Sequence, residues 1–209
     1  MTNKINMLAI DLAKGSFQVC AVGPEGTVLY NRGLSRTRLA ALLAAQPACI
    51  VAMEACATSH HWGRVAQRHG HEVRLVPAAY VKPFVKRQKN DRADAEAIAE
   101  AALRPTMRFV AVKSAETQGS AVAFRTHQCL VRQRTQLINA LRGHLAEFGL
   151  VAPKGPASLK ILENALEDQA TDLPSPVREM GAIYLDQIAR LTEVIERLAD
   201  ELEAASKTD

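Results

Sequence analysis

The chain has 209 residues, of which 48% are apolar and 4% aromatic, and its formal net charge is +4. This composition favours an α/β core with helices, and it argues against an all-β or disulfide-bonded secreted module. The sequence has no apolar run of about eighteen residues, and we expect a cytoplasmic protein with no secretory leader and no membrane span.

Short apolar runs at Met7–Ile10, Phe17–Val22 and Thr27–Tyr30 open the chain, and a turn at Gly23–Gly26 separates the last two. Short strands joined by tight turns predict an antiparallel meander.

Helices and strands then alternate. In chain order we expect a helix capped by Ser35 and ended by Pro47, a strand at Cys49–Met53, a helix at His60–His69, a strand at Glu72–Val76 and a helix that begins near Asp91. Three strands followed by alternating helices and strands predict a layered α/β domain, over residues 5–112.

Residues 113–205 have a different, helical character. Apolar residues in Ser114–Leu150 recur at helical spacing, which predicts a long helix with a basic outer face (Arg125, Arg132, Arg134 and Arg142). A second long helix follows Pro174, and from Tyr184 to Leu202 its apolar residues alternate at spacings of four and three. That spacing is typical of a coiled-coil seam, and the two helices could fold back on each other or pair with another subunit.

Four acidic residues are the strongest candidates for a functional site. Asp11 and Glu54 each follow an apolar strand, where open α/β sheets bind ligands, and Asp91 and Asp94 share a face at the start of a helix. Carboxylates are the ligands that Mg²⁺ and Mn²⁺ prefer, and two such ions about 3.5–4 Å apart can catalyse phosphoryl transfer. Taken singly, each acid could instead be a turn residue or a helix-terminus charge.

The basic residues are concentrated in the first part of the chain. Up to residue 159 there are 21 Lys and Arg against 10 Asp and Glu, and beyond it 5 against 12. A basic domain is suited to bind a polyanion. The candidate nucleic-acid contacts are Lys14, Lys82, Lys86, Arg87, Lys89, Arg92, Arg125, Arg132 and Arg134.

Other residues have simpler interpretations. Adjacent histidines do not share a helix face, so His60 and His61 are poor zinc ligands and are better suited to contact nucleic acid or support Glu54. Trp62 is expected in the core, with base stacking as the alternative. Cysteines without a Cys-x-x-Cys pair are expected to be buried free thiols.

Three segments, IDLAKGSFQV, MEACATSHHW and KNDRADAEAIAEA, resemble the DEDD transposases of bacterial insertion sequences. This group includes the Piv pilin-gene invertase and the bridge-RNA-guided recombinases. The resemblance implies a RuvC-like ribonuclease-H-like domain followed by a coiled-coil region, with Asp11, Glu54, Asp91 and Asp94 as catalytic ligands of Mg²⁺ or Mn²⁺.

The same resemblance implies DNA recombination of an insertion element, directed by a structured guide RNA within a homodimer or a tetramer of two dimers. It also implies a C-terminal transposase domain with a nucleophilic serine. No serine here is assigned to that role, so the chain is expected to be a fragment or truncated product with little strand transfer alone.

Two alternatives come from other classes of protein. One is a non-catalytic module that binds RNA or DNA and dimerises. The other is a sugar-kinase-like fold, which Asp-x-x-Lys-Gly-Ser also resembles, but such a fold needs a second, glycine-rich half that 209 residues do not contain.

Overall fold

The computed structural model describes residues 4–85, 91–153, 155 and 157–207. The chain divides into two compact units, the first ending at Ser114 and the second beginning at Ala115.

Among the described residues of the first unit, five strands form one mixed sheet. They are β1 (Met7–Leu12), β2 (Ser16–Val22), β3 (Val28–Ser35), β4 (Ile50–Glu54) and β5 (Glu72–Val76), in the spatial order β3-β2-β1-β4-β5. β2 pairs antiparallel with β1 and β3, whereas β4 pairs parallel with β1 and β5. The predicted meander and ribonuclease-H-like mixed sheet are confirmed.

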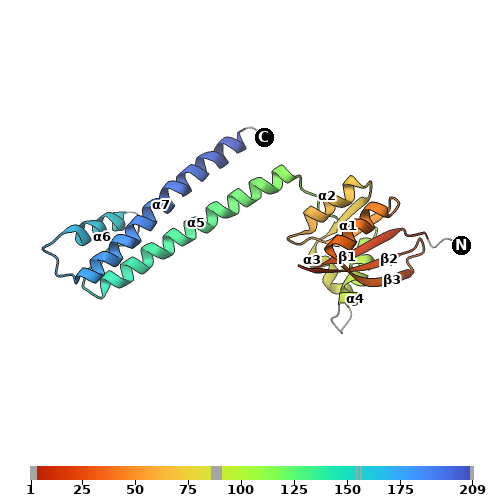
Figure 1. Cartoon of the computed structure of the whole chain (residues 1–209), viewed down its shortest axis with the longest axis horizontal. Helices are drawn as coiled ribbons and strands as arrows, with labels where there is room; N and C mark the ends of the chain where they lie inside the picture. The colour runs from red at the N-terminus through yellow and green to blue at the C-terminus, as the bar shows by residue number, and fades with distance from the viewer. Residues whose placement is uncertain (1–3, 86–90, 154, 156, 208–209) are drawn as a thin grey trace. The chain divides into compact units, whose positions relative to one another are not determined.

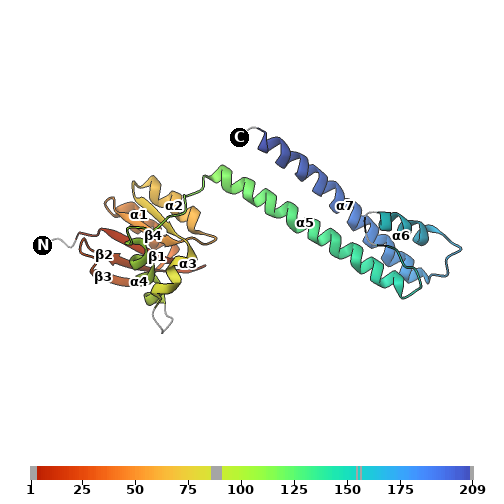
Figure 2. The ribbon, with the colours of Figure 1, turned by 180° about the vertical axis from the view of Figure 1, so that it is seen from behind.

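Helices cover both faces of this sheet (Figures 1 and 2). α1 (Arg36–Ala45) and α2 (Ser59–Arg68) pack on the face that carries Ile10, while α4 (Asp91–Ala102) packs on the face that carries Ala9. Because side chains alternate along a strand, consecutive residues of β1 enter two separate apolar layers.

Local sequence signals set several helix ends. The Ser35 side chain accepts a hydrogen bond from the Arg38 backbone N–H at 3.4 Å, so the predicted cap of α1 is confirmed. Gly70, with φ +80°, follows α2. The short α3 (Ala78–Val81) and 3₁₀ helix η1 (Lys82–Phe84) were not predicted, because elements of one turn carry no periodic pattern.

Two long helices form the second unit, α5 (Ala115–Ala146) and α7 (Ser175–Ser206), and they pack side by side (Figures 1 and 2). The predicted seam of α7 lies in this contact, where Ile188 is 1% exposed and joins a core with Leu141 of α5. Within the chain the long helices therefore form a hairpin, and pairing with another subunit stays a prediction.

A shorter helix, α6 (Ala157–Glu167), joins the hairpin core and was not predicted. A Cβ at Gly181 of α7 would lie 2.5 Å from a methyl carbon of Leu166 in α6, so the glycine allows these helices to approach closely. This packing is not visible in the spacing of either helix alone.

All four cysteines are free thiols, but only Cys20 is buried, and Cys49 is half-buried. Burial raises the pKa of the Cys20 thiol to about 11, with a further contribution from Glu96, and burial alone does the same for Cys49. The prediction of buried thiols is wrong for Cys56 and Cys129, which are exposed. Among the described helices none is long and apolar enough to cross a membrane.

Candidate metal centre

Asp11 lies near the end of the central strand β1, on the face that α4 covers. Met7 and Ala9 belong to the core beneath α4, whereas Leu8 and Ile10 belong to the core beneath α1 and α2. Alternation therefore directs the half-buried Asp11 toward α4.

Asp91 and Asp94 stand in the first turn of α4, three residues apart and so on one face of the helix. The buried face of α4 is nearly all alanine, and it meets the small Ala9 and Ala52 of the sheet. These small contacts let the helix lie close to the strands, within reach of short aspartate side chains. One carboxylate oxygen from each of Asp11, Asp91 and Asp94 lies within 4.8 Å of the other two.

Glu54 is the fourth predicted acid, and it does not join the cluster of three aspartates. It ends β4, whose parallel pairing with β1 brings Met53 opposite Ile10. Asp11 follows Ile10 and Glu54 follows Met53, so Glu54 neighbours Asp11 on the same face of the sheet. Its side chain is close enough for its charge to act on Asp11.

The electrostatics of this cluster favour a bound cation. Burial raises the pKa of the Asp11 carboxyl, and the negative charges of Asp94, Asp91 and Glu54 raise it further. A hydrogen bond with the Leu12 backbone has the opposite, smaller effect and lowers this pKa. Three carboxylates within 4.8 Å repel one another when all are ionised. An all-carboxylate donor set of this kind fits Mg²⁺ or Mn²⁺, because a hard divalent cation relieves the repulsion.

A side-chain network holds the first turn of α4 on the sheet, and it was not predicted. Asn31 of β3 donates to the backbone carbonyl of Arg92 at 3.0 Å and to the Glu96 carboxylate at 3.2 Å. Gln18, which pairs with Asp11 across β1 and β2, donates to the Asn31 side-chain oxygen at 2.7 Å. Because Arg92 lies between the two acids of α4, this network positions both of them.

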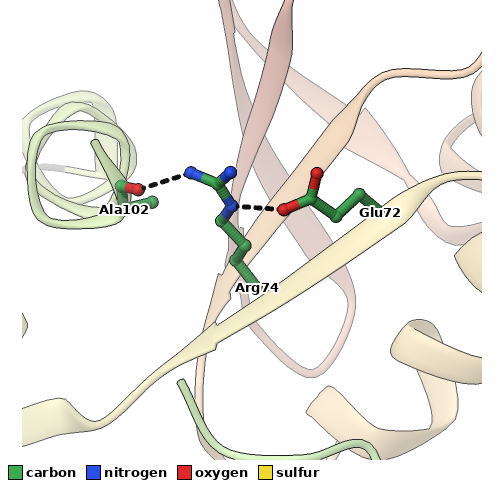
Figure 3. Close-up of polar contacts among 3 residues, drawn as sticks. All are labelled: Glu72, Arg74 and Ala102. Carbon is green, nitrogen blue, oxygen red and sulfur yellow. Dashed lines mark hydrogen bonds and ion pairs between the residues drawn. The ribbon is translucent and has the colours of Figure 1, made fainter. Parts of the chain in front are cut away.

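Arg74 of β5 holds the other end of α4 (Figure 3). Its guanidinium donates to the Ala102 carbonyl at 3.0 Å and to the Glu72 carboxylate at 2.7 Å. A cation at a helix C-terminus also interacts favourably with the helix dipole. Polar contacts from both edge strands therefore fix α4 across the sheet.

A cleft of about 480 Å³ opens beside the aspartates and is lined by Gln18, Arg32, Gly33, Asp91 and Arg92. Arg92 donates to the Asn31 backbone carbonyl at 3.2 Å, and the Arg32 guanidinium stacks over Tyr30 at 4.5 Å from the ring centre. The cleft thus places two arginines next to one of the clustered acids.

Comparison with known proteins identifies the family. Residues 8–149, well over half of the chain, match DEDD_Tnp_IS110, a family described as transposase. The chain belongs to this DEDD transposase family. Asp11, Glu54, Asp91 and Asp94 follow the order of the family's four letters, and their role as its ligands stays a prediction.

Several transposases are similar in sequence to this chain over almost its whole length. A "Probable family 20 transposase" of Pseudomonas aeruginosa is 41% identical over 98% of this chain and 61% of its own length. The transposases for insertion sequence elements IS1328 of Yersinia enterocolitica and IS1111A of Coxiella burnetii are each 37% identical, over 95% and 98% of this chain. Those alignments cover 59% and 57% of the relatives, so the chain spans little more than half of their length.

The other basic residues predicted for this DEDD transposase have varied placements. Lys14, Lys82, Arg125 and Arg132 are exposed. Lys86, Arg87 and Lys89 lie outside the described residues. The expected outer-face position is wrong for two arginines of α5: Arg134 donates to the Thr192 side chain of α7 at 3.3 Å, and Arg142 donates to the Ala152 carbonyl at 2.9 Å.

Of the predictions for residues around α2, the core position of Trp62 is confirmed, and the roles of His60 and His61 stay predictions. His60 accepts a hydrogen bond from the Lys113 backbone N–H at 3.2 Å, and in the part of the chain that the structure describes no histidine or cysteine cluster could hold a metal. Trp62 is 2% exposed and packs edge-to-face on Phe17, with ring centres 5.1 Å apart, so it is a core residue.

Proposed function

We propose that this DEDD transposase chain binds Mg²⁺ or Mn²⁺ and supplies the catalytic carboxylates for cutting and joining DNA at an insertion sequence. The observation that carries the proposal is the convergence of Asp11 from β1 with Asp91 and Asp94 from α4, where one oxygen from each lies within 4.8 Å of the other two. Two distant segments bring these charges together against their mutual repulsion, which a bound cation offsets.

The proposed roles follow from position. Asp11, Asp91 and Asp94 hold the metal, and Glu54, one strand away, adds a fourth carboxylate on the same face. When bound, a divalent cation stabilises the negative charge that develops on phosphate oxygens during phosphoryl transfer. Arg92 and Arg32 in the adjoining cleft bind the phosphate backbone and keep the scissile strand beside the acids. Two ions per site stays a prediction.

The proposed partners are the DNA of the element and its target, and a structured guide RNA. Exposed cations such as Lys14, Arg125 and Arg132 support a polyanion as the partner. We also propose that the family member works as a homodimer or a tetramer of two dimers, with the α5–α7 hairpin as the pairing element.

The test of this function is coupling between metal and DNA. If a phosphate completes the coordination of the ion, Mn²⁺ should bind more tightly to the protein–DNA complex than to the protein alone, and DNA should bind more tightly with Mn²⁺ present. Titration of Mn²⁺ followed by electron paramagnetic resonance, with and without a DNA duplex, measures this. If the DNA affinity were the same with and without Mn²⁺, and the same after substitution of all four acids, the result would instead support a non-catalytic binding module.

The raised pKa of Asp11 predicts how the stability of the metal-free protein depends on pH. A carboxyl whose pKa is higher in the folded than in the unfolded protein lowers the free energy of unfolding as pH rises between those two values. Asp11→Asn should remove this loss, so the variant should gain stability relative to the natural protein as pH is raised above about 4, the ordinary pKa of an aspartate. Urea unfolding at several pH values checks this, and a stability difference independent of pH would contradict it.

The Asn31 network predicts that substitution of Asn31 weakens metal binding, whereas substitution of an asparagine far from the site does not. Asn31→Ala should weaken Mn²⁺ binding by less than the roughly 10- to 100-fold typical of losing a direct partner of a metal ligand, because Asn31 holds the turn of α4 and not a ligand itself. Asn31→Asp should weaken it more, because a carboxylate would face the Arg92 carbonyl and the Glu96 carboxylate. Asn139→Ala, at an exposed site on α5, makes the same chemical change as a control. Equal Mn²⁺ affinity in the Asn31 and Asn139 variants would show that the network is not needed.

A further inference from the structure

The outer surface of α1 and α2 carries arginines, and the segment of sequence that forms these helices is poor in acidic residues. Between Glu25 and Glu72 the only acidic residue is Glu54, which lies on the α4 face of the sheet, whereas α1 and α2 hold four arginines. Arg36, Arg64 and Arg68 lie close enough to His61 for their charges to lower the pKa of its imidazole, after the larger effect of burial. We call the four arginines, Arg36, Arg38, Arg64 and Arg68, the arginine face.

Two members of the arginine face are held in place by neighbours. The Arg36 guanidinium stacks over Trp62 and Phe17, 5.3 and 5.6 Å from the ring centres. Arg64 donates to the Lys113 carbonyl at 2.8 Å. Arg64 and Arg68 are four residues apart, so they lie on the same side of α2. Within the described chain Arg36 and Arg68 form no ion pair with a carboxylate.

The arginine face begins at the same end of the sheet as the acidic cluster, on the opposite side. Phe17, under Arg36, pairs with Leu12, the residue after Asp11. The intervening turn between β1 and β2 carries the exposed Lys14. Basic residues therefore extend from the turn beside the acidic cluster to the outside of α1 and α2.

We propose that the arginine face is a second phosphate-binding surface, which holds the backbone of a nucleic acid engaged at the acidic cluster as that backbone passes over the sheet end. The guanidinium fork matches phosphate oxygens, and an arginine supported by an aromatic ring is already oriented for such contacts. DNA and RNA share this chemistry. The inference rests on the proposed function for its class of partner, but it needs neither a bound metal nor catalysis.

The test compares nucleic-acid binding by charge variants, in EDTA, over a range of salt concentrations. Arg36→Gln/Arg68→Gln should weaken binding of a fluorescent DNA duplex or RNA hairpin roughly tenfold, and should reduce the slope of log affinity against log salt by about two. Arg36→Lys/Arg68→Lys, which keeps the charge, should recover most of the affinity. Stronger loss on RNA than on DNA assigns the surface to RNA, and the reverse assigns it to DNA.

A matched control removes two arginines that already face carboxylates. Arg104 pairs with Glu100 and Arg190 with Asp186, so Arg104→Gln/Arg190→Gln changes the net charge equally. Equal loss in this control, or unchanged binding in Arg36→Gln/Arg68→Gln, would overturn the proposal. The proposal would also be overturned if polyglutamate competed for the surface as effectively as unlabelled DNA does. That result would indicate an acidic protein as the partner. Mn²⁺ titration of the same variants separates the two proposals, since loss of the arginine face should leave metal affinity unchanged.

Discussion

Asp11→Asn should nearly abolish binding of Mg²⁺ and Mn²⁺. Asp11 lies centrally, within 4.8 Å of both α4 acids and next to Glu54, and asparagine keeps its shape while removing the charge. The loss of affinity should exceed the 10- to 100-fold typical of an outer-shell partner, because a direct ligand is lost. Calorimetric titration of Mn²⁺ at neutral pH measures the effect.

The position of each acid predicts a ranking. Asp94→Asn should resemble Asp11→Asn, and Glu54→Gln should cost less, since Glu54 stands outside the cluster of three. Glu100→Gln, at an exposed site on the same helix, serves as the control and should bind Mn²⁺ normally. If Asp11→Asn bound Mn²⁺ as tightly as the natural protein does, the proposed metal centre would be wrong.

Trp62→Ala should destabilise the first unit by about 3–5 kcal/mol, the range for truncating a buried aromatic residue. Trp62 is 2% exposed and packs against Phe17 beneath α2. Its indole N–H has no hydrogen-bond partner among the described residues, so Trp62→Phe should cost much less. Urea unfolding followed by circular dichroism measures both.

His61→Ala is the neighbouring control for Trp62→Ala. His61 is exposed, and surface substitutions typically change stability by less than about 0.5 kcal/mol. If Trp62→Ala unfolded at the same urea concentration as the natural protein, the assignment of Trp62 to the core would be wrong.

Most of the fold was predictable because its signals are local. Apolar runs that end in turns predicted the strands, and Ser35 marked the start of α1. The position of α6 was not predictable, because its packing depends on the close approach of Leu166 to Gly181 in a distant helix. Likewise, spacing placed Arg134 on the outside of α5, whereas its reach to Thr192 depends on how α5 and α7 pair.

The acids of the candidate site were predictable and their supports were not. Asp11 follows an apolar run and Asp91 and Asp94 begin a helix, so each has a signal in its own segment. Asn31 has none, because its contact with α4 depends on strand register and on a helix sixty residues later. A polar Gln18 among the apolar residues of β2 was the available hint, since it interrupts a face that should be buried.

Location of a bound ion tests the central proposal most directly. Crystals soaked in Mn²⁺ and measured for anomalous scattering should show a peak among the oxygens of Asp11, Asp91 and Asp94, at about 2.1 Å from its ligands. Mn²⁺ bound elsewhere on the protein, with these three carboxylates empty, would contradict the proposed metal centre.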